Sequence, residues 1–205
     1  MLSQSVASAL REAISAGEFQ PGERLSEVKA AERFNCSRNT LRESFTRLAA
    51  ERIVERIPNR GVFLAMPDAD YIRDLFAARA AIEPAAVRWG AFADAPSLVT
   101  LTSSAFDYAA RGEHQEVSAI NQRFHRTLVA ALGSPTLNEQ MDNLLARMRL
   151  TFLLAIPRYP QLHADHIQGN ITLATLIADG KRDEAATLTH DSLMNTCGKI
   201  LAVLE

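Results

Sequence analysis

The chain has little of what marks secreted, membrane-spanning or thiolate-metal proteins. Only two of its 205 residues are cysteines, Cys36 and Cys197, and their separation fits neither a disulfide framework nor a thiolate metal site. No apolar run is long enough to cross a bilayer, and no basic stretch followed by an apolar one begins the chain. These absences predict a soluble, cytoplasmic protein with no membrane partner.

A large net charge is also absent, but the charges are unevenly distributed. The formal net charge is −2, and the 47% of hydrophobic residues are typical of a globular protein with an ample core. Residues 1–66 carry ten Lys and Arg against eight Asp and Glu, whereas the remainder carries twelve against sixteen. Six arginines and three glutamates lie between Arg38 and Arg60. A locally basic segment on an acidic body favours a selective DNA binder over a general polyanion coat.

The stretch from Ala30 to Leu48 predicts two short helices joined by a tight corner. Asn35 tolerates the left-handed backbone that such a corner requires, and Ser37 can cap the second helix. The second helix has one narrow apolar face, formed by Leu41, Phe45 and Leu48. An arginine-bearing helix start after a corner suits the DNA major groove, although an ordinary solvated helical hairpin has a similar pattern.

A predicted β-hairpin follows this helix pair directly. Two β-prone segments flank Pro58-Asn59-Arg60-Gly61, so Ile53–Ala65 forms a hairpin with a basic tip. Helix, corner, helix and hairpin in this order form a winged helix. The ordered run LSE, then SRNTLRESFTRLAAERIV, then a wing ending NRGVFLA resembles the DNA-binding domain of GntR-type bacterial transcription regulators across Ser3–Met66.

This resemblance implies a homodimer in the bacterial cytosol that binds a short palindromic operator in double-stranded DNA. It also implies that the start of the second helix and the wing tip contact the DNA. The residues expected to make these contacts are Ser37, Arg38, Asn39, Thr40, Arg42, Arg60 and Gly61.

The remaining sequence has a helical period almost to its end. The expected fold is mainly α, with a winged helix-turn-helix in residues 1–66 and an all-α six-helix bundle in residues 67–205. Further helices are expected at Ser3–Ala16, Val28–Phe34 and Arg38–Ala50 in the first domain. Those of the bundle are expected at Tyr71–Phe92, from the Asp94-Ala95-Pro96 restart to about Arg111, and at Glu116–Leu132, Pro135–Ile156, Gln161–Ala178 and Arg182–Val203.

Three segments of the second half resemble the FCD effector-binding domain of the FadR subgroup. They are LFAARAAIEPAAVRWGA, INQRFHRTLVAALGSP and LIADGKRDEAA. Six helices rather than seven suggest the shorter, VanR-like branch of that subgroup. The resemblance implies that the second half binds a small effector and contributes to dimerisation.

The resemblance also implies a metal site, but this chain departs from its ligand pattern. The family uses an aspartate and a histidine four residues apart on the third helix and one histidine on each of the last two helices. The matching positions here are Asn121, His125, Asn170 and Ser192, so only His125 is retained. Amides and hydroxyls hold first-row divalent metals poorly. We therefore expect no cofactor and disfavour zinc, with His166 or His163 as the conceivable substitute ligand.

The same positions predict a polar effector pocket. Ser192, Asn195, Thr196 and Lys199 form one stripe of the last helix, and the resemblance directs Arg79 inward. The residues expected to contact the effector are Arg79, Asn121, His125, Arg147, His166, Asn170, Ser192 and Asn195. Amides, imidazoles and guanidinium groups favour a small, anionic, organic-acid-type metabolite. The alternative to an effector pocket is a purely structural role, in which the stripe is solvated and the buried amides hydrogen-bond to one another.

The favoured function is therefore a ligand-responsive DNA-binding regulator, most simply a repressor. One alternative is a constitutive DNA-binding regulator whose effector site has decayed. Another is an enzyme that uses the histidine set His125, His163, His166 and His190, but no nucleophile elbow, phosphate-binding loop, HExxH or paired-carboxylate spacing accompanies them.

Overall fold

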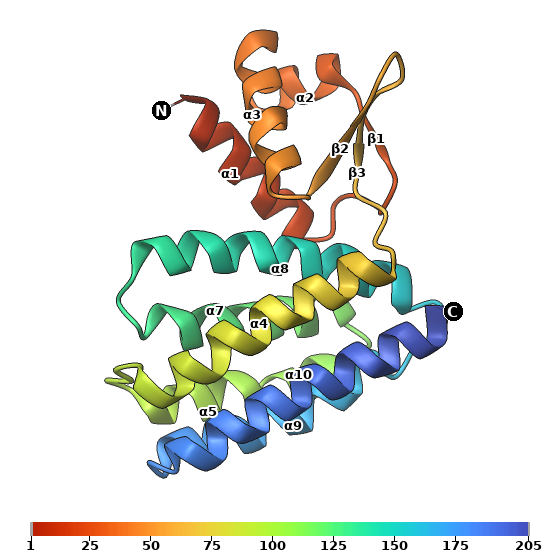
Figure 1. The fold of residues 1–205 in the computed structure, drawn as a ribbon. Coiled ribbons are helices and arrows are strands. Elements are labelled where there is room, and N and C mark those ends of the chain that lie inside the picture. The colour runs from red at the N-terminus through yellow and green to blue at the C-terminus, as the bar shows by residue number, and fades with distance from the viewer. Residues whose placement is uncertain (1, 205) are drawn as a thin grey trace. The chain divides into compact units, whose positions relative to one another are not determined.

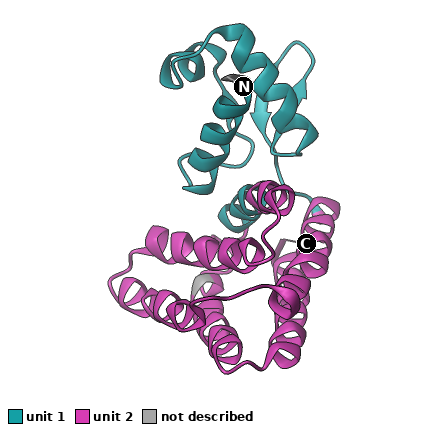
Figure 2. Ribbon diagram, turned by 90° about the vertical axis from the view of Figure 1, so that its left-hand side faces the viewer, with its two compact units in different colours: residues 1–68, 145–154 teal, residues 69–144, 155–205 magenta. Residues whose placement is uncertain are grey.

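The computed structural model describes residues 2–204, apart from the side chains of Leu2 and His163. The chain divides into two compact units (Figure 2). Unit 1 comprises residues 1–68 and 145–154, and unit 2 comprises residues 69–144 and 155–205. Ten residues of a later helix therefore group with the N-terminal segment. The domain boundary expected between residues 66 and 67 stays a prediction.

Unit 1 contains the predicted winged helix. Its helices are α1 (Leu2–Ser15), α2 (Glu27–Arg33) and α3 (Arg38–Ala50), and its strands are β1 (Arg24–Leu25), β2 (Val54–Ile57) and β3 (Gly61–Leu64). The strands form an antiparallel sheet in the order β1-β3-β2 (Figure 1). The hairpin was predicted, but β1 was not, because two residues are too few to display an alternating pattern.

The corner between α2 and α3 has the predicted local geometry. Asn35 has a φ of 45°, so it adopts the left-handed conformation that ends α2. Ser37 caps α3, since its side chain accepts a hydrogen bond from the backbone N–H of Thr40 at 3.1 Å. Phe45 is fully buried with the other apolar residues of its face, Leu41 and Leu48. The polar face of α3 therefore remains exposed.

Unit 2 is all-helical among its described residues, as predicted. Its helices are α4 (Ala69–Trp89), α5 (Ala95–Ser103), α6 (Ala105–Ala110), α7 (His114–Ala130), α8 (Pro135–Ala155, shared with unit 1), α9 (Leu162–Ala178) and α10 (Arg182–Leu204). Figure 1 shows α4 running alongside α10, and α5 packs against α9. Phe124, Leu128 and Ala174 belong to the apolar cluster that joins α4, α5, α7, α9 and α10.

One predicted helix is interrupted. The expected helix up to about Arg111 appears as α5 and α6, separated at Ser104. The hydroxyl of Ser104 donates to the carbonyl of Leu101 at 2.7 Å, and that of Thr102 donates to the carbonyl of Leu98 at 2.9 Å. Such side-chain bonds to helix carbonyls often bend a helix. The described bundle therefore has seven helical segments, so the assignment to the shorter branch loses the support of the helix count.

Candidate DNA-binding surface and effector cavity

The residues expected to contact DNA lie on the exposed side of α3 and at the wing tip. Arg38, Asn39 and Arg42 are exposed on the first turns of α3. The Ser37 hydroxyl bonds to that of Thr40 at 2.8 Å, so both side chains stabilise the helix start. Asn39 donates to Glu43 at 3.0 Å along the helix surface. Three of the expected contacts, Ser37, Asn39 and Thr40, are therefore already ordered by local bonds.

The wing tip exposes Arg60 and Gly61. Gly61 has a φ of 113°, a backbone conformation that other residues adopt only under strain. The guanidinium of Arg60 lies 5.6 Å from the centre of the Phe63 ring. A glycine beside a cation lets the backbone approach a phosphate closely.

Two further charged residues join this surface that the sequence interpretation did not assign to it. Glu27 at the start of α2 forms an ion pair with Arg42, and Arg56 on β2 donates to the hydroxyl of Thr46 at 3.1 Å. The hydrogen bond from Arg42 lowers the pKa of Glu27 from its ordinary value, with partial burial opposing it. The positive charges of Arg38 and Arg56 lower that pKa further. The motif LSE includes Glu27, but nothing in the sequence indicates that Glu27 pairs with Arg42.

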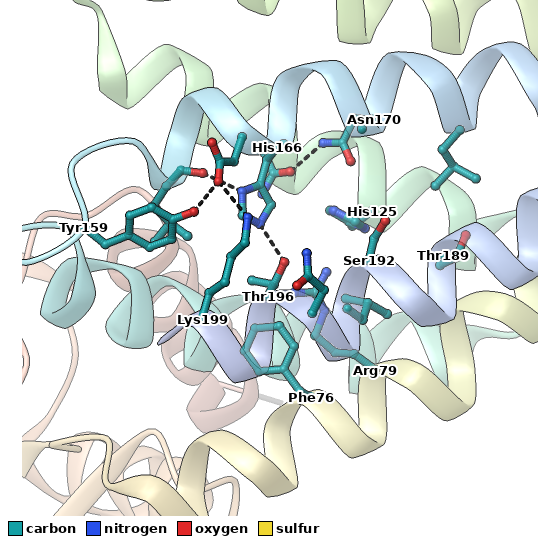
Figure 3. Close-up of a pocket in the computed structure, with 17 residues that line it drawn as sticks. Phe76, Arg79, His125, Tyr159, His166, Asn170, Thr189, Ser192, Thr196 and Lys199 are labelled. Carbon is teal, nitrogen blue, oxygen red and sulfur yellow. Dashed lines mark hydrogen bonds and ion pairs between the residues drawn. The ribbon is translucent and has the colours of Figure 1, made fainter. Parts of the chain in front are cut away.

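A cavity with a volume of about 100 Å³ lies within unit 2 and is the candidate effector site. Seven of the eight expected effector residues line it, namely Arg79, Asn121, His125, His166, Asn170, Ser192 and Asn195. Four helices supply them: α4, α7, α9 and α10 (Figure 3). These seven side chains therefore line one cavity, as expected from the resemblance and from the spacing along the last helix. Whether these residues bind an effector stays a prediction.

Arg147 is the expected effector residue that does not line the cavity. It is buried, as is Arg149, and both belong to the part of α8 that groups with unit 1. The sequence offered no indication of which face of α8 is turned toward the other helices. The expectation that Arg147 lines the cavity is therefore wrong.

Arg79, Glu83 and His125 form a buried ionic triad, and two of its members, Arg79 and His125, line the cavity. The Nε of Arg79 donates to Oε1 of Glu83 at 2.6 Å, and Nδ1 of His125 lies 2.6 Å from Oε2 of the same carboxylate. Burial would raise the pKa of Glu83, which is fully buried, but Arg79 and His125 together lower it to about 2.

The triad fixes the orientation of His125. An ionised carboxylate can only accept a hydrogen bond, so Nδ1 of His125 carries the proton and donates to Glu83. Nε2 is then the ring nitrogen left for a bound molecule, because His125 lines the cavity. Glu83 was not predicted as a site residue, although its spacing of four from Arg79 on one helix indicates such a pair.

A hydrogen bond between two side-chain amides of the cavity lining joins α7 and α9. The side-chain amide of Asn170 donates to Oδ1 of Asn121 at 2.7 Å. Ser192 and Asn195 on α10 line the cavity while remaining exposed, so the cavity is open on that side. The polar lining is therefore accessible from solvent.

Three residues at another side of the cavity form a network that the sequence interpretation missed. Tyr159 donates its hydroxyl hydrogen to Asp165, and Nζ of Lys199 donates to Oδ2 of Asp165 at 3.0 Å (Figure 3). The hydrogen bonds from Tyr159 and Lys199 lower the pKa of Asp165 below its ordinary value. Nε2 of His166 lies 3.4 Å from the hydroxyl of Thr196 nearby.

The donors at the family's metal positions do not fit a divalent metal. Asn121 and Asn170 bond to each other, and Ser192 supplies only a hydroxyl. Among the residues whose side chains are described, no group of three or more His, Cys, Asp or Glu side chains could hold a metal ion. The possible substitute His163 lies outside those side chains. A cavity that works without metal therefore stays a prediction, supported by the chemistry of its donors.

The chain matches two family descriptions in the order expected from its fold. Residues 2–64 match the bacterial regulatory proteins of the gntR family, and residues 74–195 match the FCD domain. The chain belongs to the GntR-family transcription regulators that carry an FCD domain. It is accordingly a DNA-binding transcription regulator with an effector domain, and the histidine-enzyme alternative is set aside.

Individual relatives support this assignment along nearly the whole chain. The Nta operon transcriptional regulator of Aminobacter aminovorans is 27% identical over 190 residues, which cover 91% of this chain and 89% of the relative. The repressor GlaR of Escherichia coli K12 is 29% identical over 197 residues, which cover 88% of each. The crystal structure of a GntR transcriptional regulator from Rhodococcus sp. RHA1 has a TM-score of 0.82 and 29% identity, and covers 98% of this chain and 97% of that one. No helix in the described part of the chain is long and apolar enough to cross a membrane.

Proposed function

We propose that this regulator is a cytoplasmic homodimeric repressor whose cavity senses a small organic acid without a metal ion. The observation that carries the proposal is a cavity lined by Arg79 and His125, which Glu83 holds in place, together with side-chain amides and hydroxyls. Binding of the acid there releases the protein from a palindromic operator.

The composition of the cavity lining supports a hydroxylated acid of few atoms. Asn121, Asn170 and Asn195 each offer both donors and acceptors, which suit hydroxyl groups. A volume of about 100 Å³ suits a compact molecule. The class is therefore a short hydroxy acid or sugar acid.

The charge around the triad supports a carboxylate on that molecule. The guanidinium of Arg79 carries a positive charge and lines the cavity beside Glu83. A ligand carboxylate would be attracted to this guanidinium and would accept charge-assisted hydrogen bonds from cationic groups of the lining. A neutral sugar would lack this contribution and bind more weakly.

The repressor direction is supported by the relative GlaR, which is named a repressor. Two copies of unit 1 would place one α3 in each half-site of a palindrome, since the symmetry of a dimer is mirrored in its operator. The effector changes operator affinity only by binding the DNA-competent and released states unequally.

A constitutive regulator is the second candidate, because the polar groups of the cavity already satisfy one another. Asn170 bonds to Asn121, and Lys199 bonds to Asp165. A site that had lost its ligand would keep these internal bonds. This candidate predicts no stabilisation by any organic acid.

Thermal melting of tag-free protein after metal analysis separates these possibilities. Short hydroxy acids and sugar acids are screened with and without added zinc. The proposal predicts less than stoichiometric metal, no zinc-dependent shift and a melting temperature raised by several degrees at saturating acid. Asn195→Ala should weaken that shift, and His190→Ala, an exposed histidine outside the cavity lining, serves as the matched control. Stoichiometric metal, or no shift with any acid, would contradict the proposal.

A further inference from the structure

The ion pair between α2 and α3 has a geometry that bears on base recognition. Nε of Arg42 lies 3.1 Å from each carboxylate oxygen of Glu27, and Nη2 lies 2.9 Å from Oε2. The carboxylate therefore occupies the side of the guanidinium formed by Nε and Nη2. The other edge, formed by Nη1 and the second hydrogen of Nη2, is left with two parallel N–H groups.

That remaining edge is the one that suits guanine. A guanidinium contacts guanine in the major groove by donating two parallel hydrogen bonds to O6 and N7. Because Glu27 leaves this edge available, Arg42 can contact a guanine without breaking its ion pair. The pair therefore supports base contact and does not exclude it.

The position of Glu27 is itself restrained. It is the first residue of α2, and Ser26 before it caps that helix by accepting from the backbone N–H of Lys29. The Glu27 side chain is 33% exposed, whereas that of Arg42 is 58% exposed. A partly buried carboxylate at a capped helix start thus holds a more exposed and flexible arginine.

Neighbouring charges keep Glu27 ionised for this role. Arg38 and Arg56 add their positive charges to that of Arg42 around the carboxylate. Glu27 therefore accepts hydrogen bonds from Arg42 as a full anion across the ordinary pH range. Ordering the long arginine side chain before DNA arrives reduces the conformational entropy lost on binding.

We propose that Glu27 is a positioning residue that orients Arg42 for bidentate recognition of a guanine. The proposal rests on the expected contact of Arg42 with DNA. It assigns specificity to an acidic side chain that the phosphate backbone would repel. Removal of Glu27 should therefore weaken discrimination at one base pair while leaving or strengthening binding to unrelated DNA.

The test compares base preferences of variants on duplexes selected from random DNA by the unaltered protein. Arg42→Ala first identifies the G·C pair whose preference is lost. Glu27→Gln should reduce discrimination at that same pair by roughly tenfold, the scale of a bidentate contact. Glu27→Asp keeps the charge but shortens the side chain, so it should also reduce discrimination. Melting temperatures of all variants check that the fold is retained.

Glu18→Gln is the matched control. Glu18 forms an exposed ion pair with Arg33, so this change also removes one negative charge from unit 1 without touching Arg42. It should leave base discrimination unchanged. Unaltered discrimination in Glu27→Gln, with a loss in Arg42→Ala, would overturn the positioning role alone. Unaltered discrimination in Arg42→Ala would overturn the base contact and the positioning role together.

Discussion

At the residue scale, the most consequential group is the carboxylate of Glu83. It is fully buried and holds both Arg79 and His125 at 2.6 Å. A buried pair is costly to form but more costly to break, because the remaining charge is left in a medium that solvates it poorly. The triad therefore defines the shape of the cavity wall as well as its charge.

Replacing Glu83 with Gln should destabilise the protein by about 3–5 kcal/mol, because it leaves buried Arg79 without its carboxylate. The free energy of unfolding in urea measures this loss. Glu116→Gln, an exposed acidic residue on α7, should change it by less than about 0.5 kcal/mol. A loss as small as that of the control would mean that the triad contributes little to stability.

The same carboxylate predicts a dependence of stability on pH. Its pKa is lowered from 4.5 to about 2 in the folded protein. A carboxyl group whose pKa is lower in the folded than in the unfolded protein stabilises the fold at pH values above its unfolded pKa. This contribution of Glu83 is lost as the pH falls from about 4.5 toward 2. Unfolding free energies between those pH values should fall more steeply for the unaltered protein than for Glu83→Gln. Parallel slopes would contradict the assignment.

At the scale of elements, the corner between α2 and α3 sets the direction of α3, the helix expected to contact DNA. Asn35 adopts its left-handed conformation there, with a φ of 45°. Asn35→Ala should cost about 1 kcal/mol of stability and weaken operator binding, whereas Asn35→Gly should retain both. Urea unfolding and operator titration of the two variants provide the check. An alanine variant equal to the glycine variant would show that the corner is not strained.

The sequence predicted elements best where local chemistry decides them. Asn35 favours a left-handed backbone and Ser37 favours a helix N-cap, and both adopt these roles. The four-residue spacing of Asn121 and His125 indicates one face of α7, and both residues line the cavity. The sequence interpretation failed where distant packing decides. The short strand β1 exists only through its pairing with β3, and no local pattern indicates that Arg147 lies away from the cavity.

The missed cavity residues follow the same rule. Tyr159 and Asp165 flank the start of α9, and their bonds to each other and to Lys199 depend on how α10 lies beside α9. The break at Ser104 depends on hydroxyl bonds to carbonyls that compete closely with a continuous helix. Sequence periodicity contains neither the tertiary contacts of Tyr159 and Asp165 nor this local competition at Ser104.

At the scale of the whole molecule, a dimer on a palindrome makes a distinct prediction about operator length. A duplex with both half-sites should bind two chains cooperatively, and a single half-site should bind at least about tenfold more weakly. Titration of the two duplexes at equal ionic strength measures this, because phosphate contacts make affinity depend on salt. Equal affinity for both duplexes would show that one chain binds alone.

We propose above that the cavity of unit 2 controls DNA binding without a metal. The most direct test of this proposal is the operator dissociation constant of metal-free protein, measured with and without the acid that stabilises it most. We predict a weakening of roughly 5- to 150-fold, the usual range of coupling between two sites, and a smaller effect in Asn195→Ala. An operator affinity that the acid leaves unchanged, or that responds only after zinc is added, would contradict the claim.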